Sequence, residues 1–252
     1  DLTLALTHRG HEAELHMTRC EAYLAAGAPD SAIADFDTAL QIDAVRPAAY
    51  RGRGLALVKL GDLTAALSEM TKAIRLDARY ADAYESRGDL HLNMQELEKA
   101  VADFTKLLEL ESDVPRTASV HHRRGVAHLH GRDFAAADAD FTAAIARDPI
   151  NSDAHAWRGA ARAQLDQFRA ALDDVARAIE LNPLAAEEYR QIGQSASERA
   201  VPLLSKAIAE DGQNSQLYCD RAVAYEFQNM ANEALADYNN AIQLSPEARE
   251  AF

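Results

Sequence analysis

The chain has few of the residues that build sheets or membrane spans. Valine, isoleucine and threonine are scattered and never alternate over a run, so a β-sheet has nothing from which to grow. No apolar run approaches the roughly 20 residues that a membrane-spanning helix needs. Aromatic residues make up only 6% of the 252 residues, and alanine and leucine dominate the apolar content. We therefore expect an all-α, soluble chain.

Positive charge is also scarce. The 26 lysines and arginines are outnumbered by 40 aspartates and glutamates, which gives a formal net charge of −14. Nucleic acid or an anionic membrane surface would be repelled unless basic residues gathered on one face, and no such face is apparent. We expect neither nucleic acid binding nor direct membrane insertion. No signal-peptide pattern begins the chain, but its start looks cut, so the compartment stays open with the cytoplasm slightly favoured.

What the chain does have is a period of 34 residues, marked by an arginine that is followed 16 residues later by a carboxylate. Such a period is typical of stacked repeats, in which one helical hairpin cannot bury its own apolar face and needs neighbours on both sides. The six pairs are Arg19 and Asp35, Arg53 and Glu69, Arg87 and Asp103, Arg124 and Asp140, Arg158 and Asp174, and Arg221 and Asp237.

Aligning the repeats shows large and small residues in fixed slots. In the third unit, Tyr84 takes the fourth slot and Gly88 the eighth, and the second helix carries Ala100 and then Phe104 four residues later, on the same helical face. This spacing indicates that these side chains pack between helices and take no part in chemistry.

Glycine lies between the two helices of some units, at Gly27, Gly61 and Gly131, where it suits a left-handed backbone. The units are residues 13–46, 47–80, 81–114, 118–151, 152–185, 186–214 and 215–248.

This pattern resembles the tetratricopeptide repeat, or TPR. The match is close in two stretches: His155 to Gly159 with Ala171, Ala178 and Pro183, and Tyr218 with Ala234, Tyr238, Ala241 and Pro246. The first aromatic slot holds tyrosine or histidine and never the tryptophan typical of the family, and three units lack the closing proline. The resemblance implies a single array over residues 1–252, built as a right-handed superhelical solenoid of antiparallel helix pairs. Cys20 and Cys219, in its first and last complete units, are not expected to form a disulfide.

The ends of the chain look like cuts through a longer array. We interpret residues 1–12 as the remnant of a preceding repeat or an N-terminal helix, with Gly10 where its closing turn would lie. Residues 249–252 are interpreted as the start of a further helix, with Phe252 in the fourth slot. Solenoid ends normally need polar caps, so we expect a fragment or a domain of a larger protein.

The sixth unit, residues 186–214, is five residues short. The segment 194–198 replaces a full turn, and Pro202 is tolerated best in a first helical turn, so we expect the second helix to begin near Ala200 or Val201. Either the repeat is truly shortened or a mobile loop is absent from this chain. A three-residue insertion, 115–117, lies between the third and fourth units.

The regular arginines could in principle bind phosphate or carboxylate ligands. However, each arginine has its own acidic partner at a fixed separation. In the sixth unit Ile192 and Leu203 occupy the two slots, so both charges are lost together. A structural ion pair explains this joint loss and a ligand site does not, so we interpret the six pairs as structural.

Catalytic signatures are missing: there is no glycine-rich phosphate loop, no nucleophile motif and no carboxylate pair outside the repeat slots. Four histidines lie close together in the sequence, and neutral imidazoles are common metal ligands: His121, His122, His128 and His130. Of these, His121 and His128 take slots that hold tyrosine in other units, which favours packing. We expect no enzyme activity, no metal and no cofactor.

The resemblance implies a concave groove, lined by the first helices, that takes a peptide. The groove should be acidic near the N-terminus, and basic with aromatic anchors from the fourth unit onward. Trp157, the only tryptophan, either points into this groove or packs against a neighbouring helix. The candidate groove residues are Arg51, Glu85, His122, Arg123, Trp157, Gln164 and Arg190.

Two functions remain open. The first is a scaffold that binds another protein through an extended peptide or a helix carrying acidic and apolar side chains. The alternative is a regulatory or assembly domain of a larger multidomain enzyme, which self-associates through its ends or through the irregular sixth unit.

Overall fold

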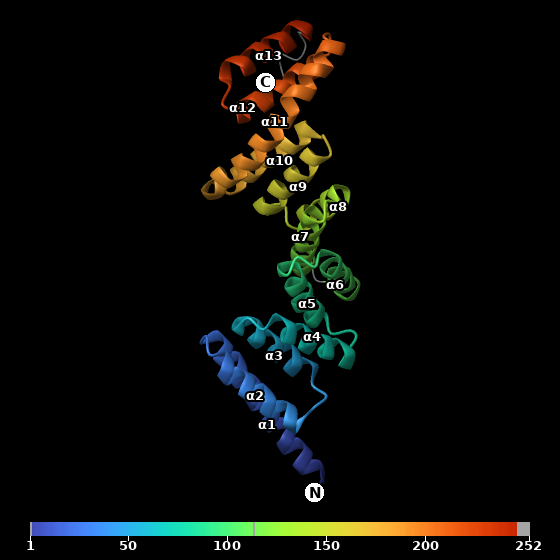
Figure 1. Ribbon diagram of the computed structural model, residues 1–252, viewed down its shortest axis with the longest axis vertical. Helices are drawn as coiled ribbons and strands as arrows, with labels where there is room; N and C mark the ends of the chain where they lie inside the picture. The colour runs from blue at the N-terminus through green and yellow to red at the C-terminus, as the bar shows by residue number, and fades with distance from the viewer. Residues whose placement is uncertain (1, 113, 246–252) are drawn as a thin grey trace. The chain divides into compact units, whose positions relative to one another are not determined.

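A computed structural model describes the backbone of residues 2–112 and 114–245 and the side chains of residues 12–112 and 115–245. Residues 246–252 lie outside this part, so the further helix expected at 249–252 is not described. All regular elements of the described residues are helices (Figure 1). The chain divides into two compact units, residues 1–113 and residues 114–252, which are described separately.

The first unit contains three helical hairpins. Its helices are α1 (Leu2–Ala25), α2 (Pro29–Ile42), α3 (Pro47–Leu60), α4 (Leu63–Leu76), α5 (Ala81–Asn93) and α6 (Leu97–Leu110). Each odd-numbered helix packs against the even-numbered helix that follows it, and successive hairpins stack so that α1 contacts α3 and α3 contacts α5. The turn expected at Gly10 is absent, because α1 runs through that residue without interruption.

The second unit contains α7 (Val114–His130), α8 (Phe134–Arg147), α9 (Ser152–Gln164), α10 (Phe168–Leu181), α11 (Ala186–Glu210), α12 (Ser215–Phe227) and α13 (Ala231–Leu244), with a short 3₁₀ helix at Pro183–Ala185. Three hairpins, α7 with α8, α9 with α10 and α12 with α13, are interrupted by α11, which is single. The insertion 115–117 forms no separate link; it lengthens α7 at its N-terminal end, where proline is tolerated.

The hairpin turns place a left-handed residue at the fifteenth slot of the repeat. Gly27 and Gly61 adopt φ values of +71° and +84°, as expected. Gly131 does not, because the fifteenth slot of its unit is Arg132, with φ of +62°. Backbone hydrogen bonds from Arg132 N to Leu129 O and from Asp133 N to His128 O close this turn, so the C-terminal capping pattern persists without glycine.

The core is built from the slots seen in the sequence. Phe104 and Phe141 are fully buried, and a Cβ added at Gly88 would lie 2.8 Å from the Phe104 ring. A Cβ at Gly125 would likewise lie 3.0 Å from Phe141. The small eighth slot therefore makes room for the large residue of the second helix.

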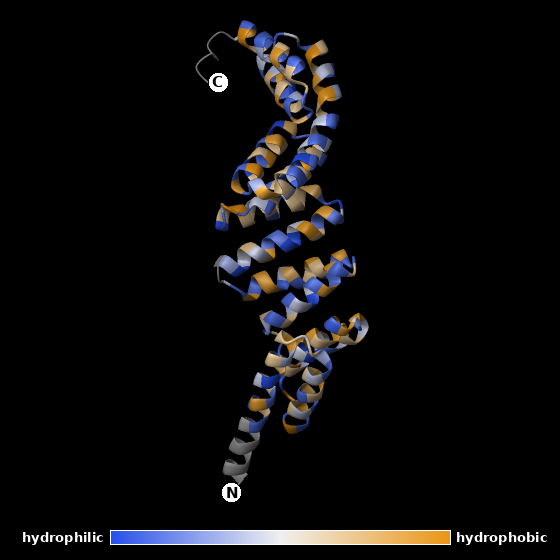
Figure 2. Ribbon diagram, turned by 90° about the vertical axis from the view of Figure 1, so that its left-hand side faces the viewer, coloured by the Kyte–Doolittle hydropathy of each residue, from blue (hydrophilic) through white to orange (hydrophobic). Residues whose placement is uncertain are grey.

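Along each helix hydrophobic residues are interspersed with hydrophilic ones (Figure 2). Most of the residues that become buried are apolar, and they form the core. Among the described residues, no helix combines the length and apolar character needed to cross a membrane.

Helix α11 corrects the expectation for the sixth unit. No second helix begins near Ala200: a single helix runs from Ala186 to Glu210, with Pro202 inside it. The physical reason is the five-residue deficit, which removes the turn and joins the two arms. Proline has no N–H, so Pro202 leaves the carbonyl of Glu198 without its usual helical donor. Both residues are exposed, and water can donate to that carbonyl.

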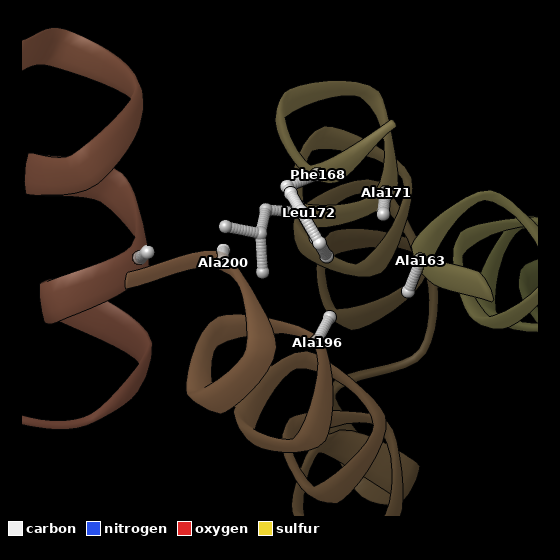
Figure 3. Packing of buried hydrophobic residues seen from close by; sticks show 7 residues of the cluster. Ala163, Phe168, Ala171, Leu172, Ala196 and Ala200 are labelled. Carbon is white, nitrogen blue, oxygen red and sulfur yellow. The ribbon is translucent and has the colours of Figure 1, made fainter. Parts of the chain in front are cut away.

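One helix in the place of two changes the packing around it. Ala196 and Ala200 of α11 lie against Ala163 of α9 and Phe168 and Leu172 of α10 (Figure 3). Because α11 provides no second arm, α10 also contacts α12 directly.

Candidate functional site

The six arginine–carboxylate pairs lie inside hairpins and connect their two helices. In the third hairpin Arg87 Nε donates to Asp103 Oδ2 at 2.8 Å and Nη2 donates to Oδ1 at 2.7 Å. Asp103 is 5% exposed, so the carboxylate is satisfied by this bidentate contact in a nearly dry site. The same arrangement joins Arg19 and Asp35, Arg124 and Asp140, Arg158 and Asp174, and Arg221 and Asp237. In the second hairpin Nε and Nη2 of Arg53 both donate to Oε2 of Glu69.

The arginines also reach back to the preceding repeat, which sequence reasoning missed. Arg87 Nη1 donates to Thr71 Oγ1 at 3.2 Å, on the second helix of the hairpin before. The sequence does carry a signal for this contact, namely a short polar residue 16 positions before the arginine. The same backward contact joins Arg53 to Asp37, Arg158 to Thr142, and Arg221 to Ser205. Because three of its nitrogens are engaged, such a guanidinium is poorly placed to bind a ligand.

These pairs make stability depend on pH. The hydrogen bond from Arg19, more than that from His16, lowers the pKa of Asp35 to about 2 although burial acts in the opposite direction. Burial raises the pKa of Asp140, but hydrogen bonds from His121 and Arg124 outweigh it and lower that pKa as well.

We expect the chain to lose stability as the pH falls from about 4 to about 2. A carboxyl whose pKa is lower in the folded than in the unfolded state, about 3.9 for aspartate, stabilises fully above the unfolded value and loses this effect as the pH falls through the folded one. Urea unfolding of the chain and of Asp35→Asn between pH 5 and pH 2.5 measures this, and the variant should show the shallower pH dependence. Parallel curves would exclude Asp35 as a contributor.

The four clustered histidines do not converge. His121 Nδ1 lies 2.9 Å from Asp140 Oδ1 and His128 Nε2 lies 3.8 Å from Asp140 Oδ2, so both face the ion pair. The ring of His122 packs edge-on against Phe141 at 5.6 Å, and burial lowers its pKa. His130 is exposed. In the part of the chain that the structure describes, no three histidine, cysteine, aspartate or glutamate side chains are grouped to hold a metal ion.

The first helices of consecutive repeats lie side by side within each unit and form a surface that we call the first-helix face: α1, α3 and α5 in the first unit, and α7, α9 and α11 in the second. In the first unit, a pocket of about 350 Å³ opens between α3 and α5. Leu55, Val58 and Leu90 contribute apolar surface, and Glu85 lies in its wall.

Arg51, the basic residue of this pocket, is held by its own chain. Its Nε donates to Ser86 Oγ at 2.9 Å and to Asp82 O at 3.2 Å, across the junction of α3 and α5. Arg51 and Glu85 thus line the same pocket, and Arg51 also links two repeats.

In the second unit, a pocket of about 390 Å³ opens between α9 and α11, and we call it the Trp157 pocket. Trp157 and Gln164 line it from α9. Trp157 is half-buried, because its ring also packs against the cluster of Ala137, Phe141 and Ala161. One part of the indole is therefore fixed by packing, and another part faces the pocket.

The remaining wall of the Trp157 pocket combines small apolar residues with polar ones. Ala160, Ala163, Ile192 and Ala196 provide the apolar part, and Gln164, Glu188, Gln191, Ser195 and Arg199 the polar part. The α11 residues could not be assigned from the sequence, because their position depends on α11 being one continuous helix.

The other sequence-predicted residues lie elsewhere. His122 lines a separate pocket of about 460 Å³ near the N-terminal ends of α7 and α9, together with Asp153. Arg123 donates its Nε–H to Ser119 O. Arg190 lines a pocket with Ile179 of α10 and Phe227 of α12. The structure thus unites Trp157 with Gln164 but does not gather His122, Arg123 and Arg190 around them.

The hairpins and their slots agree with a known family. Family models described as tetratricopeptide repeat match residues 17–84, 51–115 and 85–138, and a further model of the same description matches residues 215–247. Together these matches cover more than half of the chain. No curated protein matches the chain by sequence.

Solved structures of TPR proteins share the fold. The C-terminal part of a TPR repeat-containing protein from Cytophaga hutchinsonii is 20% identical, with a TM-score of 0.64 over 95% of this chain and 86% of that one. A tetratricopeptide repeat protein from Parabacteroides merdae is 18% identical, with a TM-score of 0.63 over 93% and 94% of the two chains. YrrB, described as a TPR protein with an unusual peptide-binding site, is 17% identical, with a TM-score of 0.55 over 84% and 93%. The all-α repeat fold and the matched models together show that the chain belongs to the tetratricopeptide repeat family.

Proposed function

We propose that the chain is a protein-interaction scaffold that binds an extended peptide or a helix on its first-helix face. Membership of the TPR family supports a scaffold role in general, and the peptide-binding site named for YrrB supports a peptide as the form of the partner. The observation that carries the proposal is the Trp157 pocket between α9 and α11.

Trp157 is suited to anchor a partner because part of its ring is already fixed. Its contacts with Phe141 and Ala161 hold the indole in place before binding, so little side-chain entropy remains to be lost. Tryptophan is among the residues most enriched at the energetic centres of protein interfaces. A partner side chain that entered the pocket would bury the exposed part of the indole.

The surroundings of Trp157 suit a peptide. Ala160, Ala163 and Ala196 are small, so they leave room for an incoming side chain between the two helices. The amides of the exposed residues Gln164 and Gln191 carry both hydrogen-bond donors and acceptors, which an extended main chain requires. This combination of an apolar floor with a few polar groups is typical of binding pockets.

Substitution of Trp157 tests the proposal. A displayed library of random 12-residue peptides is selected against the chain, and the binders are synthesised. We expect them to change the emission of Trp157, which as the only tryptophan reports on this pocket alone. We also expect Trp157→Ala to weaken binding by about 30-fold or more by calorimetry, as for an interface hot spot of about 2 kcal/mol.

Leu184→Ala serves as the matched control, because Leu184 is fully exposed and lies in the 3₁₀ helix outside the pocket. Its binding should equal that of the unchanged chain, and circular dichroism should show both variants equally helical. Full binding by Trp157→Ala would place the site elsewhere.

A further inference from the structure

The charges around the Trp157 pocket differ from those that the sequence suggested. Arg190 belongs to the pocket with Phe227, where its Nη1 lies 3.5 Å from Glu187 Oε2. The basic residue that does reach the Trp157 pocket is Arg199, and its guanidinium is engaged: Nη1 donates to Ala163 O and Nη2 to Asp166 Oδ1, each at 2.9 Å. The positive charge of Arg199 is thus compensated by Asp166.

The carboxylate of Glu188 is placed differently. Glu188 is among the residues that line the Trp157 pocket, it lies in the first turn of α11, and it is exposed. Within the described part of the chain, the structure shows no salt bridge that involves Glu188. The other polar residues of the pocket, Gln164, Gln191 and Ser195, carry no formal charge. The local charge is therefore negative, in a chain whose formal net charge is −14.

We propose that the Trp157 pocket takes a lysine or arginine side chain of the bound segment. Lysine and arginine combine an apolar stem with a cationic head, and such side chains commonly lay the stem on apolar surface while the head stays at the polar edge. The apolar stem would pack on Ala160, Ala163 and Ala196, and the cationic head would pair with Glu188. The indole of Trp157 adds attraction, because tryptophan has the aromatic face that binds cations most strongly.

This inference rests on the proposed function and reverses the expected partner charge. The acidic partner expected from the sequence rested on a groove that is basic from the fourth unit onward, with Arg123 and Arg190 among its residues. Arg190 instead lines a pocket with residues of α10 and α12. An acidic side chain in the Trp157 pocket would lie near Glu188, and the basic residue of that pocket, Arg199, is already paired with Asp166. An acidic anchor would be repelled there, whereas a basic one would be attracted.

The test uses the selected 12-residue peptides, resynthesised with each lysine or arginine replaced in turn by norleucine, which keeps an apolar stem without the charge. We expect one such replacement to weaken binding about tenfold, since a partly desolvated cation over an indole beside a carboxylate contributes roughly that much. Replacement of the same residue by glutamate should weaken binding further. Calorimetry and Trp157 emission provide the affinities.

Glu188→Gln separates the contribution of this carboxylate from that of general attraction. In this variant the ratio of affinities between the basic peptide and its norleucine form should shrink several-fold, because the basic peptide no longer has the Glu188 carboxylate to pair with. Glu210→Gln is the control: it removes the same charge at the other end of α11, where the exposed residue lies outside the pocket, and should leave the ratio unchanged.

The outcomes distinguish this inference from the proposed function. If binding requires Trp157 but the selected peptides lack basic residues, or tolerate norleucine without loss, the basic anchor is wrong and the scaffold function stands. Equal effects of Glu188→Gln and Glu210→Gln would also overturn the anchor, since only general charge would then be acting. If Trp157→Ala has no effect, the proposed site itself fails.

Discussion

Replacing Arg87 by alanine is expected to lower the free energy of unfolding by about 3–5 kcal/mol, the range measured when one partner of a buried ion pair is removed. The reason is the carboxylate of Asp103, which is 5% exposed and accepts two hydrogen bonds from Arg87. Without the guanidinium, this charge stays in a nearly dry site. Asp103→Ala should destabilise in a similar way, because Arg87 is itself only 20% exposed. Urea unfolding followed by circular dichroism measures both effects.

The double variant Arg87→Ile with Asp103→Leu should recover much of this loss. Replacing a buried ion pair by apolar residues is often neutral, because no uncompensated charge remains. The two residue types are those that the sixth unit carries at Ile192 and Leu203. If the effects of the single substitutions add strictly in the double variant, the two residues do not interact and the structural interpretation of the pairs is wrong.

Phe141→Ala is expected to lower the free energy of unfolding by about 3–5 kcal/mol, as is usual when a buried phenylalanine is truncated. Phe141 is fully buried, and its ring lies where a Cβ of Gly125 would approach to 3.0 Å. The cavity would lie beneath Trp157, which packs on the same cluster. We therefore expect acrylamide to quench Trp157 emission more readily in this variant, at a urea concentration where it remains folded.

The matched control for this variant is Ile150→Ala. Ile150 is 74% exposed, so truncation should change the free energy of unfolding by no more than about 0.5 kcal/mol. Should Phe141→Ala unfold at the same urea concentration as the control, the ring is not the packing centre of its hairpin.

The hairpin architecture could be predicted from the sequence because the same slots recur. Tyr84, Gly88 and Phe104 are each one member of a series, and a single substitution in one unit does not hide the period. The left-handed turn residue was harder to assign. Glycine is only one residue that can fill the fifteenth slot, and in the fourth unit Arg132 fills it, next to the glycine that the sequence favoured.

Helix α11 could not be predicted, because the period assumes a hairpin in every unit. The shortage of residues was visible, and so was the joint loss of charge at Ile192 and Leu203. Their common physical cause was not: an arginine–carboxylate pair joins the two arms of a hairpin, and a single helix has no second arm. In the structure Ile192 packs against the cluster of Val175 and Tyr189, while Leu203 is exposed.

The candidate site was predictable only in part. The family slots placed Arg51, Glu85, Trp157 and Gln164 on one groove. In the structure Arg51 and Glu85 line one pocket, and Trp157 and Gln164 line another. The charge that the site offers to a partner depends on which arginines are already paired within the chain. Such pairing depends on three-dimensional contacts, which the sequence does not show. Arg199, which the sequence did not single out, lies in the Trp157 pocket, while Arg190 lies in another.

The most direct measurement is the indole N–H signal of Trp157 in a two-dimensional ¹H–¹⁵N spectrum. With one tryptophan, the chain gives one such signal, and its assignment needs no further variant. On titration with a selected peptide that carries a basic residue, we expect this signal to shift progressively and to saturate at the calorimetric affinity. The same titration of Glu188→Gln should require more peptide. Saturated binding with an unmoved indole signal would contradict the proposal that the Trp157 pocket is the binding site.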